Sequence, residues 1–99
     1  PTIIFDEIDT GVSGEMADAM GNIMKSMSNS MQVFAITHLP QIAAKGDQHF
    51  KVSKRTDGAR TTSTLTLLDK ESRIAEIAQM LSGSAVSDSA INHARALLN

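Results

Sequence analysis

The sequence contains no cysteine, tryptophan or tyrosine and only three phenylalanines among its 99 residues. The absence of cysteine excludes disulfide bonds and cysteine-ligated zinc, and it fits a reducing compartment. With so few aromatic residues, the core must be built from aliphatic side chains and from the six methionines, which fill irregular gaps. No apolar run is long enough to span a bilayer, so we expect no membrane partner.

The chain also lacks a large excess of either charge. Its formal net charge of −2 provides no global field that would attract nucleic acid or an anionic membrane. The segment of residues 51–60 is locally basic, with four of the nine basic residues: Lys51, Lys54, Arg55 and Arg60. This segment could contact DNA phosphates locally, but the lack of interleaved aromatic residues and the nearby acids favour a solvated face.

An apolar run at the start of the chain ends abruptly in two carboxylates, Asp6 and Glu7. Residues 2–5 predict a short strand buried on both faces. The pattern has the form of a Walker B motif, in which one carboxylate is a hard oxygen ligand for Mg²⁺ and the other activates or orients water. Its usual partner, the phosphate-binding loop GxxxxGK[ST], does not occur in this sequence. We therefore interpret residues 1–99 as a single fragment of a larger nucleotide-binding domain.

A second apolar run over residues 32–37 predicts another buried strand, and residues 15–27 between the two runs have helical periodicity. A strand–helix–strand unit of this length predicts parallel strands. His38 would then share one sheet edge with Asp6 and Glu7, at the carboxyl ends where open α/β folds bind ligands. The residues of the intervening helix expected to face the core are Met16, Met20, Ile23, Met24 and Met27.

The second half of the chain changes character. Residues 49–55 and 61–68 alternate in the manner of β-strands, and residues 56–58 form a turn signal between them, which predicts an antiparallel hairpin. Two amphipathic helices should follow, the first ending at Gly83 and the second beginning at Ser87. The hairpin residues expected to be buried are Phe50, Val52, Leu65 and Leu67, and the helical core positions are Ile74, Ile77, Ala78, Leu81, Ile91, Ala94, Leu97 and Leu98.

Two segments together carry a family resemblance: DEIDTGVSG at residues 6–14 and AITHLPQIAA at residues 35–44. In this order and spacing they resemble the RecN family of bacterial DNA repair proteins, which is similar to the SMC proteins and belongs with the ABC-type ATPases. HFKV at residues 49–52 and the closing helix extend the resemblance over essentially the whole chain. It implies an α/β fold, the C-terminal lobe of a P-loop ABC-type ATPase head, whose Walker A and signature motifs are missing here.

The resemblance implies a role for each residue at the predicted sheet edge. Asp6 matches the Walker B aspartate that holds Mg²⁺, and Glu7 matches the catalytic glutamate. His38 matches the switch histidine that contacts the γ-phosphate, and an imidazole can donate a hydrogen bond to developing phosphoryl charge. Each has a plainer alternative, because Asp6 and Glu7 could be solvated carboxylates and His38 could be a capping or core histidine.

Residues 9–13 match the D-loop, which in this family crosses to the partner head of an ATP-bound dimer. The resemblance therefore implies that Asp9, Gly11 and Ser13 lie at the cofactor, although Asp9 could simply shape its loop. Ser13 stands where many ABC proteins carry an acid, so the acid's role does not transfer. The tetrapeptide LSGS at residues 81–84 resembles the ABC signature but follows Walker B and closes a helix, so we interpret it as a helix C-terminus.

These inferences predict part of an ATPase that binds ATP and Mg²⁺ between two identical heads and acts in recombinational repair of DNA double-strand breaks. The expected partners are ATP, DNA and the second head, and the expected location is the bacterial cytoplasm at the nucleoid. The fragment alone should be inactive. The alternatives are the head of another SMC- or ABC-type ATPase, a DEAD-box helicase, and a non-catalytic dimerisation or scaffold module. A helicase would carry a Ser-Ala-Thr motif where this chain has residues 36–38.

Overall fold

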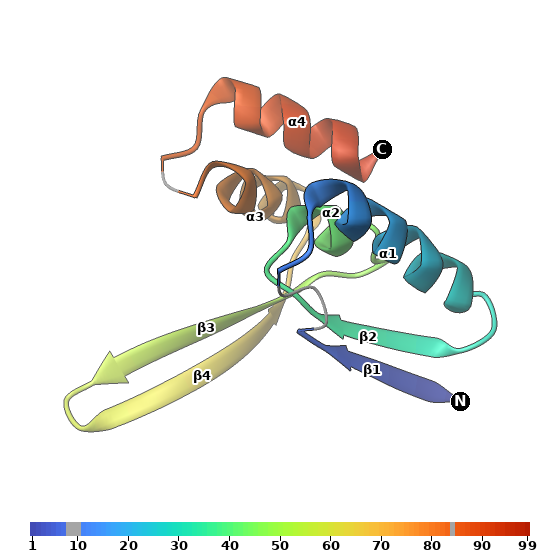
Figure 1. The fold of residues 1–99 in the computed structure, drawn as a ribbon. Helices are drawn as coiled ribbons and strands as arrows, with labels where there is room; N and C mark the ends of the chain where they lie inside the picture. Colours follow the sequence, from blue (N-terminus) through green and yellow to red (C-terminus); the bar gives the residue numbers. More distant parts are fainter. Residues whose placement is uncertain (8–10, 84) are drawn as a thin grey trace.

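The fold was analysed in a computed structural model, which describes residues 1–7, 11–83 and 85–99. It is an α/β structure in which a parallel strand–helix–strand unit is followed by a short helix, a long hairpin and two further helices (Figure 1). The elements are β1 (Thr2–Asp6), α1 (Gly14–Met27), β2 (Gln32–Ile36), α2 (Pro40–Ala43), β3 (Phe50–Asp57), β4 (Arg60–Leu67), α3 (Lys70–Ser82) and α4 (Asp88–Leu98). The predicted order of elements is confirmed.

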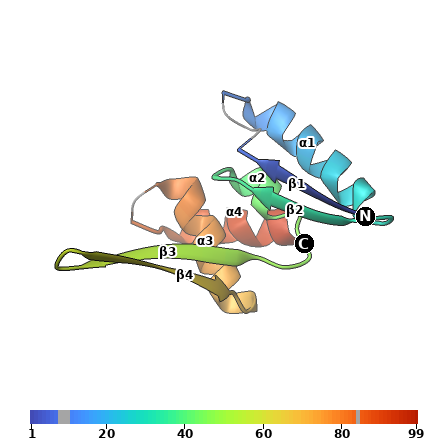
Figure 2. The same ribbon diagram turned by 90° about the horizontal axis from the view of Figure 1, so that it is seen from below.

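The strands β1 and β2 pair in parallel, as the strand–helix–strand pattern predicts. The register runs from Thr2 opposite Gln32 to Asp6 opposite Ile36. The pairing continues one residue past β1, where the Glu7 amide donates to the Ile36 carbonyl at 3.0 Å. Helix α1 returns across one face of this pair, and the two strands therefore end at the same edge of the sheet (Figures 1 and 2).

The prediction that both strands are buried on both faces is wrong. Alternate residues face α1, and the others lie on a face that no described element covers. On that face Ile4 is 64% exposed, Phe34 48% and Ile36 54%. The apolar pattern of β1 and β2 is typical of strands in a sheet whose two faces are both buried. In the described residues, only one face of the strand pair is covered, and α1 covers it.

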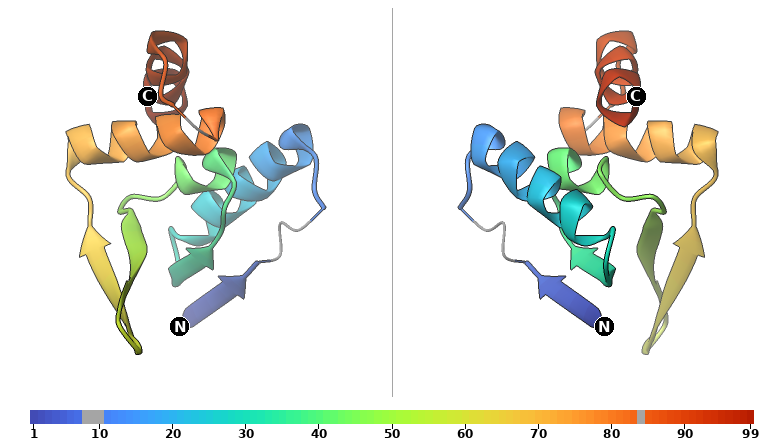
Figure 3. Two further views of the ribbon diagram at one scale, coloured as in Figure 1. Left: turned by 90° about the vertical axis from the view of Figure 1, so that its left-hand side faces the viewer. Right: turned by 90° about the vertical axis from the view of Figure 1, so that its right-hand side faces the viewer.

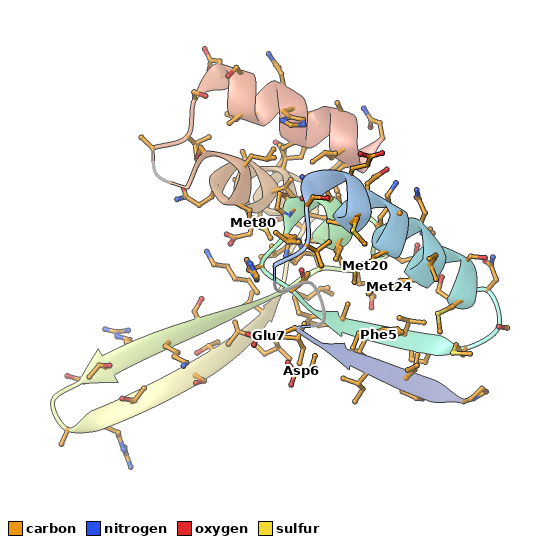
Figure 4. The ribbon with its side chains drawn as sticks, in the orientation of Figure 1. Phe5, Asp6, Glu7, Met20, Met24 and Met80 are labelled. Atoms are coloured by element: carbon orange, nitrogen blue, oxygen red, sulfur yellow. The ribbon has the colours of Figure 1, made fainter. Side chains whose placement is uncertain are left out.

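The first hydrophobic cluster lies between α1, the strand pair and α2. Its buried members are Ala17, Met24 and Ile42, against which Phe5 and Met20 pack (Figure 4 labels Phe5, Met20 and Met24). The methionine stripe is only partly confirmed, because Met16 and Ile23 are exposed at 59% and 61%. The buried line of α1 instead passes through small residues, which allow the backbones of α1 and α2 to approach closely.

Gly21 marks that close approach of α1 to α2. A Cβ atom at this position would lie 2.9 Å from Cγ of Lys45 and 3.3 Å from the carbonyl oxygen of Gln41. A larger residue would push the two helices apart, and this constraint rotates the buried face of α1 toward Ala17 and Gly21.

The hairpin of β3 and β4 forms as predicted, with Phe50 opposite Leu67 and a tight turn after Asp57 in which Gly58 adopts φ +65°. The prediction that its apolar residues are buried is wrong. Phe50, Val52, Leu65 and Leu67 are 44 to 65% exposed. Local alternation predicted the strands correctly, but the hairpin extends away from the helices, and neither described hydrophobic cluster includes any of its residues (Figures 1 and 2).

The second hydrophobic cluster joins α3 to α4, which lie beyond α2 from the strand pair (Figure 3). Its buried residues are Ile74, Ile77, Ala78, Ala90 and Ala94, and Leu81, Ile91, Leu97 and Leu98 are partly buried against it. The predicted helix ends are confirmed: Gly83 is the left-handed C-cap of α3, and the Ser87 hydroxyl accepts from the Ala90 amide at 3.2 Å. Within the described residues, no helix is long and apolar enough to cross a membrane.

Arg73 connects the two clusters. Its guanidinium, carried by α3, donates to the carbonyl oxygens of Ala43 at 3.1 Å, Ala44 at 3.4 Å and Gly46 at 2.5 Å. Ala43 is the last residue of α2, and Ala44 and Gly46 follow it, at the end where a helix leaves carbonyl acceptors without partners inside the helix. Arg73 therefore closes the C-terminus of α2 from another helix, and it also interacts favourably with the negative end of the α2 dipole.

The base of the hairpin rests beside this arginine. The His49 carbonyl accepts from the Leu68 amide at 2.9 Å, and Lys51 forms an ion pair with Glu76 of α3 at 2.8 Å. Burial, with the positive charges of Arg73 and Lys51, lowers the pKa of His49, and the charge of Glu76 opposes this shift. The neutral imidazole is therefore the form favoured at the junction of hairpin and helix.

Replacing Arg73 should destabilise the fold substantially. In Arg73→Met the three carbonyl oxygens lose their shared charged donor, while the aliphatic packing is largely kept. We expect the free energy of unfolding to fall by about 2–3 kcal/mol, measured by denaturant titration. Arg95→Met, which removes an exposed arginine from α4, is the matched control and should change stability by about 0.5 kcal/mol or less. Equal losses in the two variants would contradict the capping role of Arg73.

Candidate functional site at the carboxyl edge of the parallel strands

The structure brings the predicted catalytic residues to one sheet edge. Asp6 is the last residue of β1, Glu7 follows it, and His38 lies two residues beyond the end of β2. The in-register pairing and the hydrogen bond from Glu7 to Ile36 hold the two chain ends side by side. All three side chains are exposed, and Figure 4 shows Asp6 and Glu7 at the tip of β1. The edge is therefore open to a ligand.

Glu7 has an unusual backbone conformation. Its φ of 53° makes it the one non-glycine residue with positive φ in the described chain. For an L-residue other than glycine or asparagine, the left-handed region costs roughly 1–2 kcal/mol, and such outliers gather at functional sites. The strand ends at Asp6, and the chain turns at Glu7. Successive side chains within β1 alternate between the two faces of the sheet, and Glu7 does not continue this alternation.

The connection after β2 is shaped by Thr37 and Pro40. The Thr37 hydroxyl accepts from the Leu39 amide at 3.0 Å, and Pro40 occupies the first position of α2, where a missing amide hydrogen costs nothing. His38 stands in this short connection. Its place at the edge is therefore set by the end of β2 on one side and by the start of α2 on the other.

The N-terminus of α1 lies near the same edge. Ser13 is the N-cap of α1, and its hydroxyl accepts from the Met16 amide at 3.3 Å. A Cβ atom added to Gly14 would lie 3.5 Å from Nε2 of Gln41, so α1 begins against α2. The family resemblance implied that Ser13 lies at the cofactor, and its capping role was not predicted. A serine directly before a helical pattern, with an acid such as Glu15 in the first turn, is a signal for a helix N-terminus that could have predicted it.

Of the other two predicted D-loop residues, the structure describes Gly11 but not Asp9. Gly11 is exposed and has φ +75°, a conformation that favours glycine. Asp9 lies outside the described residues. At the opposite end of the chain, Leu81 and Ser82 close α3 and Gly83 caps it, as predicted for a helix C-terminus, and Ser84 is also outside the described residues.

The donor set at this edge fits one mode of magnesium binding. In the described residues, no three His, Asp or Glu side chains come together in a way that would hold a metal ion by themselves. Mg²⁺ is commonly held by one or two carboxylates, with water and phosphate oxygens completing an octahedron. Asp6 supplies one exposed carboxylate of this kind, so the edge suits a nucleotide-associated Mg²⁺ and not a cage made only of protein ligands.

Two shallow grooves lie elsewhere on the molecule. One is lined mainly by α3 and α4 and includes Lys70, Arg73 and Arg95, and the other runs past Lys45 and Asp47. Neither includes Asp6, Glu7 or His38. The candidate residues therefore lie along an exposed sheet edge, outside these two grooves.

Comparison with known proteins identifies what this chain is similar to. The DNA repair protein RecN of Vibrio cholerae is 41% identical over 98 residues, which are 99% of this chain and 18% of that protein. The chain is a RecN-like segment. RecN of Bacillus subtilis is 44% identical over 97 residues, and RecN of Deinococcus radiodurans is 43% identical over 98 residues. The chain spans 17 to 18% of the length of these curated relatives.

A solved structure supports the fold of this RecN-like segment. It belongs to work on ATP-driven dimerization and DNA-stimulated activation of SMC ATPases, and it is similar with a TM-score of 0.70 at 24% identity. The match covers 86% of this chain and 50% of that one. The arrangement of strands and helices is thus the fold of part of an SMC ATPase, as the sequence resemblance implied. No protein-family model matches the chain.

Ser13 can be tested as a helix cap. Ser13→Ala removes the acceptor for the Met16 amide and should lower the free energy of unfolding by about 1 kcal/mol, measured by denaturant titration. Ser13→Asp keeps an acceptor and adds a negative charge at the helix N-terminus, so it should preserve stability. If both variants were as stable as the wild type, the capping role of Ser13 would be wrong.

Proposed function

We propose that this chain is the C-terminal lobe of an ATPase head in a RecN-like DNA repair protein, and that ATP is hydrolysed between two such heads. The observation that carries the proposal is the convergence of Asp6, Glu7 and His38 at the carboxyl edge of β1 and β2. The phosphate-binding loop and the signature motif would come from other parts of the protein, and residues 1–99 alone should not turn over ATP.

Each residue has a distinct task in the proposed reaction. Glu7 accepts a proton from the attacking water or orients it. Its positive φ turns the chain directly after Asp6, so the two carboxylates leave the sheet edge together. His38 donates a hydrogen bond to the γ-phosphate as negative charge develops there. Catalysis of this kind depends on positioning and charge stabilisation more than on covalent chemistry.

Asp6 would hold Mg²⁺, directly or through water. When bound, this ion neutralises charge on the phosphate oxygens. Asp6 lies on the uncovered face of the strand pair with Ile4, Phe34 and Ile36, so a further protein segment packed on that face would enclose the carboxylate. Gly11, Ser13 and Asp9 would lie toward the second head, which supplies the other half of the nucleotide site.

The proposed partners of the whole protein are ATP, DNA and a second copy of the head. Support comes from the RecN relatives, which are named DNA repair proteins, and from the SMC ATPase structure, which was studied for dimerization driven by ATP. We infer repair of DNA double-strand breaks by recombination as the process, in the bacterial cytoplasm at the nucleoid. Imaging of a fluorescently tagged copy before and after DNA damage would check that location.

Glu7→Gln in the full-length protein should abolish turnover while ATP binding is kept. The substitution removes the base but leaves Asp6 intact, so we expect the ATPase rate to fall by about 10²- to 10⁴-fold. Turnover and nucleotide affinity should be measured with and without DNA. Glu71→Gln, an exposed substitution on α3, is the matched control and should retain full activity. Unchanged turnover in Glu7→Gln, or no turnover in the wild type, would favour a dimerisation or scaffold module.

His38→Ala should slow hydrolysis by about 10²-fold, because one preorganised donor to the transition state is lost. Nucleotide affinity should fall only modestly, since the same donor contributes less in the ground state. Single-turnover kinetics separate the two effects. His93→Ala removes an exposed histidine from α4 and should behave as the wild type. Full activity of His38→Ala would reduce His38 to a structural residue of the connection between β2 and α2.

A further inference from the structure

The hairpin of β3 and β4 projects from the body of the molecule as an isolated two-stranded ribbon. Figure 2 shows it extending past the ends of the helices, and Figure 3 shows it directed away from α3 and α4. Every residue of both strands is exposed. A ribbon of eight residues per strand reaches about 27 Å, so its outer end is well separated from the candidate ATPase edge.

The strand register divides the hairpin into two halves of different chemistry. Near the body, Phe50 pairs with Leu67 and Val52 with Leu65. Beyond them both faces are polar, and we call residues 53–64 the hairpin tip. The cross-strand pairs of the tip are Ser53–Thr64, Lys54–Ser63, Arg55–Thr62, Thr56–Thr61 and Asp57–Arg60. The tip thus combines cations with hydroxyl groups on a narrow surface.

The cations of the tip are not neutralised within the described structure. Lys51, below the tip, is bound to Glu76, whereas no described carboxylate lies within ion-pairing distance of Lys54, Arg55 or Arg60. Asp57 is the one acid of the tip. The tip is therefore positive, although the whole chain carries a net charge of −2. A polyanion would be attracted to the tip by these charges.

We propose that the hairpin tip binds the phosphate backbone of double-stranded DNA, in place of the solvated face that the sequence alone favoured, because no described acid pairs with Lys54, Arg55 or Arg60. Arginine donates to phosphate in a bidentate fashion, and serine and threonine hydroxyls are common phosphate donors. A two-stranded ribbon is narrow enough to lie along the major groove, which is about 12 Å wide. The tip has no aromatic residue on which unpaired bases could stack, so its chemistry suits duplex DNA better than single strands. This inference rests on the part of the proposed function that names DNA as a partner, and it adds the surface that would hold the DNA; it does not use the chemistry of the ATPase edge.

The test is DNA binding by the full-length protein with Arg55→Gln and Arg60→Gln combined. Fluorescence anisotropy with a labelled duplex of random sequence, at several KCl concentrations, gives both affinity and salt dependence. Each lost phosphate contact should lower the affinity about fivefold near 0.15 M salt and reduce the log–log salt slope by about 0.9. The double variant should therefore bind about 10- to 30-fold more weakly than the wild type. Circular dichroism and thermal unfolding should match the wild type, because both residues are exposed.

The matched control combines Lys70→Gln and Arg95→Gln, which removes two exposed positive charges from α3 and α4. This control should keep the wild-type affinity and salt slope. Equal weakening in both double variants, no weakening in the hairpin variant, or no duplex binding by the wild type would overturn the proposal. ATP turnover without DNA, measured on the same proteins, reports on the ATPase proposal separately, because the hairpin variant should retain it.

Discussion

The in-register parallel pairing of β1 with β2 is the constraint on which the candidate site depends. The two strands are joined through a helix, so only their backbone pairing determines which residues meet at the carboxyl edge. The hydrogen bond from Glu7 to Ile36 extends that pairing to the point where both strands leave the sheet. A shift of one residue would exchange the faces of every side chain, and Asp6 would then point toward α1. The position of the Asp6 carboxylate is thus set by the backbone pairing of five residue pairs.

The stability of the body rests on small residues and on polar connections. Among the described residues, Ile77 is the largest fully buried side chain, and three of the five buried residues in the cluster of α3 and α4 are alanines. Little apolar volume is therefore available to hold α2 against α3. Arg73 compensates by donating to three carbonyls, and burial lowers its pKa while the nearby charge of Asp47 opposes the shift. The two halves of the molecule are joined by a charged group at a helix end as much as by hydrophobic contact.

Local sequence patterns predicted the elements well because each depends on a few neighbouring residues. The turn at Gly58, the cap at Ser87 and the helix stop at Gly83 are short-range effects, and all three are confirmed. Burial was predicted poorly. Ile4 and Val52 have the pattern of core residues, yet what covers them is not determined by that pattern. Arg73 was missed for a related reason, because its carbonyl partners lie 27 to 30 residues away in the sequence. The shared sheet edge of Asp6, Glu7 and His38 was predicted from the strand–helix–strand pattern, and the structure confirms it. The Walker B form of Asp6 and Glu7 came from the residues, whereas the role of His38 came from the family resemblance.

The slender attachment of the hairpin has a mechanical consequence. The ribbon is fixed to the body at its base, where Lys51 is bound to Glu76 and His49 to Leu68. With an arm of about 27 Å, a rotation of about 10° at this base would displace the outer end by about 5 Å. The hairpin is therefore a lever, and small movements among the helices would be magnified at its far end.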